Sequence, residues 1–269
     1  MEGVRGFSGK KVLPKFRTQT RGNCIYVAAT TWMEASLRIA GITVELSPED
    51  LEDKERNLLD RVHDRTLNCL KVLKEVGICS KHDYEKKQGA FKELGMVVQI
   101  VDCVTYSVRN VRPFSFLLLD SCKKALESIR TCPLLFVFHI DTNYYAYVQR
   151  FGQLPILSYG KFEEGKMEGH AACGTGFGVE EIVPFWEFMN SAGKNFLAGG
   201  FGRILPHDVY HVYEHDGIIV RRPVRRNKRS RECFKDGDDS DGDLPPTKKQ
   251  KRDEVYLMHQ DNVMPPHMP

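Results

Sequence analysis

Cys24 is the residue whose type and position could most directly support chemistry in this chain. A cysteine attacks as its thiolate, and an unperturbed thiol with a pKa of about 8.5 is only a few per cent ionised at neutral pH. A helix N-terminus and a neighbouring imidazolium both lower that pKa. Asn23 is typical of an N-cap residue, and apolar periodicity follows it, so we expect a helix over 24–40. Cys24 would then stand at a helix N-terminus.

Four strings, in order along the chain, resemble those of one enzyme family. They read QTRGNCIYVAATTWME (19–34), GHAACGTGFG (169–178), FWEFMNSAG (185–193) and GGFGRI (199–204). They resemble the Q-G-x-C-G-S-C-W, H-A-V-x-x-V-G-Y-G, Y-W-x-x-K-N-S-W-G and N-G-Y-x-R-I strings of papain-like cysteine proteases. In that family the histidine and asparagine lie roughly 130–150 residues after the cysteine. His170 falls within that spacing and Asn190 somewhat beyond it.

The resemblance implies a role for each of four residues. Cys24 would be the nucleophile of a cysteine-type endopeptidase that cleaves a peptide or protein substrate through a thioacyl enzyme. His170 would take the thiol proton and later protonate the leaving amine. Asn190 would fix the histidine tautomer, and Gln19 with the backbone N–H of Cys24 would bind the oxyanion. The resemblance implies neither a cofactor nor a metal.

Departures from the family pattern favour an alternative, a catalytically weak or inactive homologue that acts as a binding scaffold. Gln19 stands five residues before Cys24, whereas the family's glutamine stands six before. No glycine pair lies between Gly41 and Gly77, so the family's substrate-binding glycines have no counterpart, and residues 52–66 are rich in charge. Ala192 replaces the tryptophan that covers the histidine–asparagine bond, and we expect that bond to be open to water.

Taken singly, these residues carry less meaning. A histidine chosen from the nine in the chain is more often a surface or core residue, and Asn190 alone could belong to a turn. Their order and their flanking strings favour the catalytic interpretation.

Helical patterns come first along the chain and strand patterns follow, which favours an α+β fold. Two apolar stripes on residues 24–40 predict a helix buried on most sides. Ser47 and the proline after it predict the start of a second helix, and a third should end near Gly77. The predicted elements that follow are a short helix at 122–129 and strands at 96–101, 133–140, 144–148, 171–177, 185–189 and 201–205.

The resemblance implies a papain-like two-lobed arrangement. We expect a helical lobe at about 20–110, a β-rich lobe at about 111–220 and the active-site cleft between them. The eight cysteines are scattered without a C-x-x-C pair, which disfavours zinc and disulfide-isomerase chemistry and suits a reducing compartment. Several stand in apolar surroundings, where a cysteine behaves as a small hydrophobic residue. The net charge of +3 is too small to indicate a nucleic-acid partner for the whole chain.

Residues 221–269 differ in composition from the rest, and we expect a disordered charged tail. Residues 221–231 hold seven Lys or Arg, residues 236–243 hold five Asp, and residues 245–252 are again basic. The basic clusters resemble nuclear-import signals, so an import receptor is an expected partner. A merely solvated tail ranks second and nonspecific nucleic-acid binding third, and no aromatic residues interleave the arginines.

The chain carries no apolar signal segment and no apolar run of the ~18 residues that a membrane span needs. We therefore expect no membrane association, and a location in the cytoplasm or nucleus. If the chain is a fragment that lacks its signal and propeptide, a vacuole or lysosome would be expected instead.

Overall fold

The structure is a computed structural model that describes residues 2–3, 6–7, 10–20, 22–94, 103–114, 119–141, 144, 155–158, 168–196, 199–223 and 254–258. The helices are α1 (Cys24–Ile39), α2 (Pro48–Arg56), α3 (Arg65–Glu75), α4 (Lys81–Leu94), α5 (Leu119–Thr131) and the 3₁₀ helix η2 (Pro206–Asp208). The strands are β1 (Glu2–Gly3), β2 (Gly6–Phe7), β3 (Lys10–Lys11), β4 (Ile78–Cys79), β5 (Thr105–Val108), β6 (Val111–Phe114), β7 (Leu134–Ile140), β8 (Ile156–Leu157), β9 (Glu168–Glu180), β10 (Val183–Met189), β11 (Phe201–Ile204), β12 (Val209–His215), β13 (Gly217–Arg221) and β14 (Glu254–Met258).

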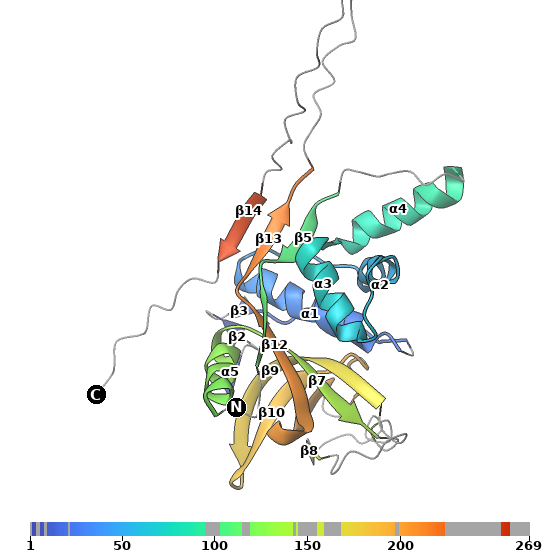
Figure 1. Ribbon diagram of the computed structural model, residues 1–269. Coiled ribbons are helices and arrows are strands. Elements are labelled where there is room, and N and C mark those ends of the chain that lie inside the picture. Colours follow the sequence, from blue (N-terminus) through green and yellow to red (C-terminus); the bar gives the residue numbers. More distant parts are fainter. Residues whose placement is uncertain are drawn as a thin grey trace, which may run out of the picture.

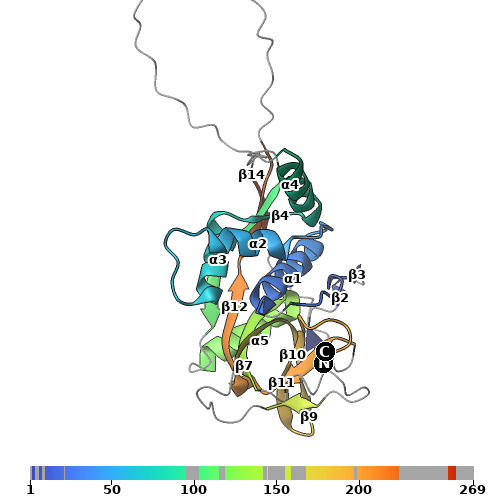
Figure 2. The ribbon, with the colours of Figure 1, turned by 90° about the vertical axis from the view of Figure 1, so that its right-hand side faces the viewer.

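The elements form a helical part and a β-rich part, as the sequence predicts (Figure 1). The larger sheet has the order β6-β12-β7-β9-β10-β11-β8, with β1 paired to β9. A smaller sheet, β14-β13-β5-β4, belongs to the helical part, where β5 packs against α3. Figure 2 shows α1 above the curved strands β9 and β10 of the larger sheet. The α+β fold class is therefore confirmed.

Helix α1 is the central element of the fold, and the expected burial is confirmed. All of its residues from Ile25 to Leu37 are buried, because both apolar stripes find partners. The indole Nε1 of Trp32 donates to the Pro133 carbonyl at 3.0 Å and so ties the helix to the start of β7. The buried hydroxyl groups of α1 donate to backbone carbonyls one turn earlier, for example Ser36 to Trp32 at 3.0 Å. Their hydrogen bonds are therefore satisfied although they are buried.

The predicted start of the second helix at Ser47 and the predicted end of the third near Gly77 are confirmed. The Ser47 hydroxyl accepts the backbone N–H of Asp50 at 3.0 Å at the start of α2. The Asp64 carboxylate accepts the backbone N–H of Thr66 at 2.7 Å at the start of α3. Gly77 follows α3 with a φ of +74°, a conformation that favours glycine.

Asn23 stands at the N-cap of α1, but its side chain makes no capping hydrogen bond. Its φ of −108° and ψ of 18° leave the β region that N-cap residues typically occupy, so the expected capping role is wrong. The backbone carbonyl of Asn23 instead accepts the N–H groups of Tyr26 and Val27, at 3.2 and 3.3 Å.

The predicted boundary between the lobes is wrong for β13. This strand was expected in the β-rich lobe, but it pairs with β5, with Ile218 opposite Val108, in the sheet of the helical part. The chain therefore returns to the helical part after β12. The returning segment ties the two parts together, because His215 at the end of β12 is hydrogen-bonded to Ser36 of α1 at 2.8 Å.

We expected residues 221–269 to form a disordered tail, but part of this segment is a strand. Arg221 ends β13, and Glu254–Met258 forms β14, which pairs with β13 in the register Gly217 opposite Met258 and Arg221 opposite Glu254. The composition of residues 221–269 is dominated by charge blocks, which obscure one short apolar run that can pair with an available strand edge. Both basic clusters therefore belong largely to the connection between two paired strands.

Most other predicted elements are confirmed. They are the helix α5 and the strands β7, β9, β10 and β11, although Leu205 lies beyond the end of β11. The expected strand at 96–101 lies outside the described residues, and of the one at 144–148 only Tyr144 is described, in a 3₁₀ conformation. None of the helices in the described part of the chain has the length and apolar character that crossing a bilayer requires.

Candidate active site

Cys24 is the first residue of α1, and the N-terminus of this helix meets β9. The preceding turn contains Gly22, whose φ of +80° favours glycine. Arg65 Nη1 donates to the Gly22 carbonyl at 2.7 Å, which holds the turn from the start of α3. Burial raises the pKa of the Cys24 thiol, whereas hydrogen bonds from the backbone N–H groups of Ala171 and Ile25 and the Arg65 charge favour the thiolate. The thiol thus lies against the residue that follows His170.

His170 lies on β9 in the centre of the larger sheet, opposite Phe138 of β7. Its Nε2 is 2.9 Å from Asn190 Oδ1, so the expected histidine–asparagine pair is present. The Tyr144 hydroxyl is also 2.9 Å from the same Nε2. Burial lowers the pKa of His170 to about 4, and the Asn190 hydrogen bond opposes that shift. A donor at Nε2 facing Asn190 leaves Nδ1 as the basic nitrogen of the neutral ring.

The histidine–asparagine bond is covered, and the expectation that Ala192 leaves it open to water is wrong. His170 and Asn190 are each only 2% exposed. The Tyr144 ring lies 4.9 Å from the His170 ring and 5.1 Å from the Phe196 ring, and the Phe138 ring packs edge-on against His170 at 5.3 Å. These aromatic side chains provide the cover, so the small residue at 192 leaves no exposed bond.

Asn190 directly follows β10, and a hydrogen bond from its backbone holds it in position. Its N–H donates to the Gly200 carbonyl at 2.9 Å, just before β11. Gly200 has a φ of +92°, and a Cβ there would lie 2.2 Å from the Phe16 ring, so only glycine fits this turn. The glycine-rich string at 199–204 therefore supports the asparagine.

Gln19 is brought to the same region by contacts with the strand end at Ser191. The Gln19 backbone N–H donates to the Ser191 carbonyl at 2.7 Å, and the Ser191 hydroxyl donates to Gln19 Oε1. Because that oxygen is already an acceptor, the side-chain NH2 group of Gln19 is the part of the amide that can donate. Thr18 bridges to Ala192 in an isolated antiparallel pair, which adds a second contact between the same two segments. The one-residue shift of Gln19 in the sequence is thus compatible with this position.

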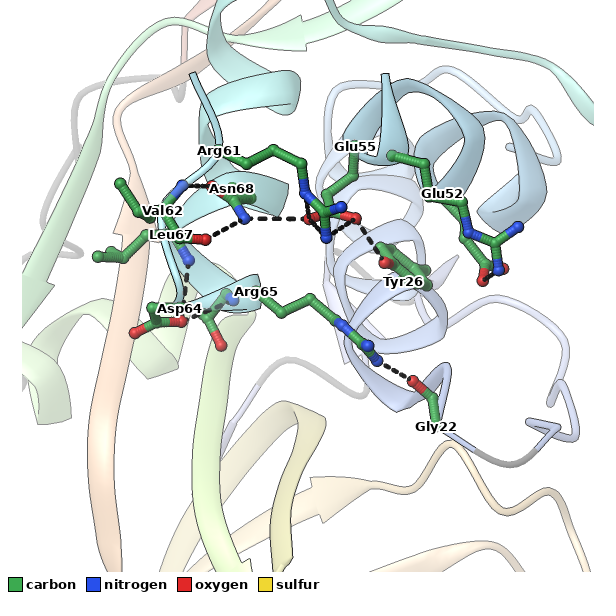
Figure 3. Close-up of polar contacts among 12 residues, drawn as sticks. Gly22, Tyr26, Glu52, Glu55, Arg61, Val62, Asp64, Arg65, Leu67 and Asn68 are labelled. Carbon is green, nitrogen blue, oxygen red and sulfur yellow. Dashed lines mark hydrogen bonds and ion pairs between the residues drawn. The ribbon is translucent and has the colours of Figure 1, made fainter. Parts of the chain in front are cut away.

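The charged segment at 52–66 is organised around a buried carboxylate (Figure 3). Glu55 is 0% exposed and accepts hydrogen bonds from the Tyr26 hydroxyl and from Asn68 Nδ2, each at 3.0 Å. Arg61 Nη2 is 3.0 Å from the same carboxylate. These contacts anchor the connection between α2 and α3 onto α1 at Tyr26, two residues after Cys24. The buried Glu55 carboxylate thus anchors the connection, while most residues between α2 and α3 are exposed.

Two residues of this region were missed by sequence reasoning. Ser191 stands directly after Asn190 in the FWEFMNSAG string, so its neighbourhood was visible, but its bond to Gln19 depends on tertiary contact. Tyr144 belongs to no motif, and no sequence signal places it on the histidine. Within the described residues, no group of three or more His, Cys, Asp or Glu side chains could hold a metal ion.

No protein-family model matches the chain, and no curated protein matches it in sequence. Solved structures do match it. The cysteine protease of Carica candamarcensis has a TM-score of 0.55 and 16% identity, covering 76% of this chain and 93% of that one. The bromelain protease of Ananas comosus has a TM-score of 0.52 and 16% identity, covering 76% of this chain and 94% of that one. A procathepsin B of Trypanosoma congolense has a TM-score of 0.54 and 14% identity, covering 76% of this chain and 72% of that one. At these identities the likeness establishes the fold.

Proposed function

From the premise that this chain has the papain-like cysteine protease fold, we propose that it is a cysteine-type endopeptidase with Cys24 as nucleophile. One arrangement carries the proposal. The Cys24 thiol lies by the backbone N–H of Ala171, the residue after His170, and His170 Nε2 is hydrogen-bonded to Asn190 Oδ1 at 2.9 Å. A thiol, a buried base and a group that orients the base are what acyl transfer by a cysteine requires.

In the acylation step Cys24 Sγ attacks the scissile carbonyl carbon, and the thiol proton moves to His170 Nδ1. The imidazolium that forms donates its Nε2–H to Asn190 Oδ1, which is 2.9 Å away. The Tyr144 hydroxyl, at the same distance from Nε2, is a second oxygen that can accept from it. His170 then gives the proton to the leaving amine as the C–N bond breaks, and a thioacyl enzyme remains.

The oxyanion of the tetrahedral intermediate would accept hydrogen bonds from the Cys24 backbone N–H and the Gln19 side-chain amide. The Cys24 N–H belongs to the first turn of α1, where backbone donors lack partners within the helix. The Ser191 hydroxyl orients the Gln19 amide through its oxygen. In deacylation a water attacks the thioester, its proton passes to His170, and the thiol of Cys24 leaves with that proton.

The protonation states of Cys24 and His170 predict how the activity falls at acidic pH. Burial disfavours both charged forms, since it lowers the pKa of His170 to about 4 and raises that of Cys24. His170 is therefore neutral, and able to accept a proton, at every pH well above 4. Catalytic efficiency on a peptide should rise as pH rises through about 4 and be nearly flat at neutrality. The apparent pKa of this acidic limb is a property of the Cys24–His170 pair and not of either residue alone.

The experiment is an initial-rate profile of kcat/KM for hydrolysis of a peptide mixture, with new termini identified by mass spectrometry. In Asn190→Ala the hydrogen bond that supports the imidazolium is lost, so the acidic limb should move to lower pH while the rate falls. An acidic limb near 6.5 would contradict a buried base, since that is the value of an unperturbed histidine. Absence of any cleavage over the whole range would refute the endopeptidase proposal.

The cellular location stays a proposal from composition. Most of the basic residues at 221–231 and all of those at 245–252 lie outside the described residues. We propose that they bind an import receptor and direct the chain to the nucleus. A fluorescent fusion of the whole chain should be enriched in nuclei, and replacing the basic residues of both clusters with glutamine should remove the enrichment. A fusion that is excluded from nuclei would contradict this proposal.

A further inference from the structure

Two cysteines that are well separated in the sequence meet in the smaller sheet of the helical part. Cys79 ends β4 and pairs with Thr105 of β5. Cys103 precedes Thr105 by two residues, and side chains two apart along an extended chain share a face. Each thiol shifts the pKa of the other, as expected for side chains that lie close together on one face of the sheet. The pair therefore stands as two adjacent thiols, although the sequence shows only scattered cysteines.

The charges around this pair favour one thiolate. Lys87 of α4 has its Nζ 3.8 Å from Cys79 Sγ and 4.0 Å from Asp50 Oδ1. Lys54 Nζ is 2.6 Å from Asp50 Oδ2, so two ammonium groups and one carboxylate face the thiols. The Cys79 hydrogen bond, with Lys87 and Lys54, lowers the pKa of Cys103 to about 6. The same contact with Cys103, burial and Asp50 raise the pKa of Cys79.

Accessibility divides the pair into an attacking and a resolving thiol. Cys79 is fully buried, whereas Cys103 is partly exposed. Thiols that respond to peroxide are accessible, ionised at neutral pH and adjacent to a second cysteine that resolves the oxidised product. Cys103 and Cys79 satisfy these requirements in that order. Within the described residues they belong to no cluster that could hold a metal ion, so metal binding does not compete with this assignment.

We propose that Cys103 and Cys79 form a peroxide-reactive dithiol that a hydroperoxide converts to a disulfide. The Cys103 thiolate attacks the terminal oxygen of the hydroperoxide, the O–O bond breaks, and Cys103 sulfenic acid and an alkoxide or hydroxide form. Cys79 then attacks the sulfenic sulfur, its proton leaves with the displaced hydroxide as water, and the S–S bond forms. Two thiols are oxidised and one hydroperoxide is reduced to an alcohol or water.

The disulfide would close the chain around α4, which begins at Lys81, two residues after Cys79. It would also remove the thiolate that Lys87 faces. None of these residues takes part in the proposed peptidase chemistry, so the dithiol stands whether or not that function holds.

The probe is hydrogen peroxide, added to the full reduced chain at about pH 6, where most unperturbed thiols are protonated. Non-reducing peptide mapping should find a Cys79–Cys103 disulfide. Cys103 should be consumed roughly 10-fold faster than Cys122, a cysteine on α5 that is also partly exposed. In Cys79→Ser the reaction should stop at Cys103 sulfenic acid, which a dimedone-type reagent traps. Lys87→Met should slow the oxidation of Cys103 several-fold.

Cys122→Ser is the matched control, and it should form the same disulfide at the same rate. Two results would overturn the proposal. One is consumption of Cys103 no faster than Cys122 in the wild-type chain, a measurement that needs no variant to fold. The other is a sulfenic acid on Cys103 that persists in the wild-type chain without pairing to Cys79.

Discussion

Cys24→Ser is expected to lower kcat/KM for peptide hydrolysis by at least about 10⁴-fold while leaving the melting temperature nearly unchanged. The replaced atom is the one that bonds to the substrate in the thioacyl enzyme. A serine hydroxyl is far less acidic than a thiol, and a site built around a thiol and a buried imidazole does not ionise it. The size of the side chain changes little, so α1 and its contacts with β9 should be preserved. Peptide turnover and thermal unfolding measured on the same preparation test both parts.

The matched control is Cys122→Ser, the same substitution at a partly exposed cysteine on α5. It should leave turnover unchanged. If Cys24→Ser retained activity within a few-fold of the wild-type chain, the assignment of the nucleophile would be wrong.

Gln19→Leu is expected to lower kcat by about 10²–10³-fold with a much smaller effect on KM, because an oxyanion donor acts mainly in the transition state. Leucine keeps the approximate size but removes the amide. The backbone bond from Gln19 to Ser191 is retained, since it does not involve the side chain. Steady-state kinetics that separate kcat from KM provide the measurement.

Ser191→Ala distinguishes a direct role of Gln19 from a structural one. This change removes the hydroxyl that orients Gln19 Oε1 but leaves the donor in place. We expect a loss smaller than that of Gln19→Leu. If Gln19→Leu raised KM alone, the glutamine would bind substrate generally and the oxyanion role would be lost.

The helices α1, α2, α3 and α5 could be predicted because their signals are local, whereas α4 (Lys81–Leu94) was not predicted. The two apolar stripes of α1 and the cap at Ser47 depend on neighbours within a few residues. The catalytic candidates were also found, because their strings resemble a known pattern over a long stretch of sequence. Asn23 shows the limit of this reasoning. Its type predicted a capping side chain, but with this φ and ψ the side chain makes no capping hydrogen bond.

What could not be predicted depends on contacts between distant residues. The cover over His170 comes from Tyr144, Phe138 and Phe196, which share no motif and converge only in the folded chain. The same holds for Glu55, one of the many charged residues at 52–66, which is buried among three donors. The pairing of β14 with β13 was hidden by the charge blocks that separate the two segments.

The central claim is that Cys24 is a nucleophile activated by His170. It is tested most directly by an epoxide-type thiol-protease inhibitor whose covalent adducts are mapped by peptide mass spectrometry. The wild-type chain should carry one adduct, on Cys24, and Cys103→Ser should react equally because the dithiol is a separate site. His170→Ala should lose most of the labelling while remaining folded. No adduct on Cys24, or the same labelling in His170→Ala as in the wild-type chain, would contradict the account.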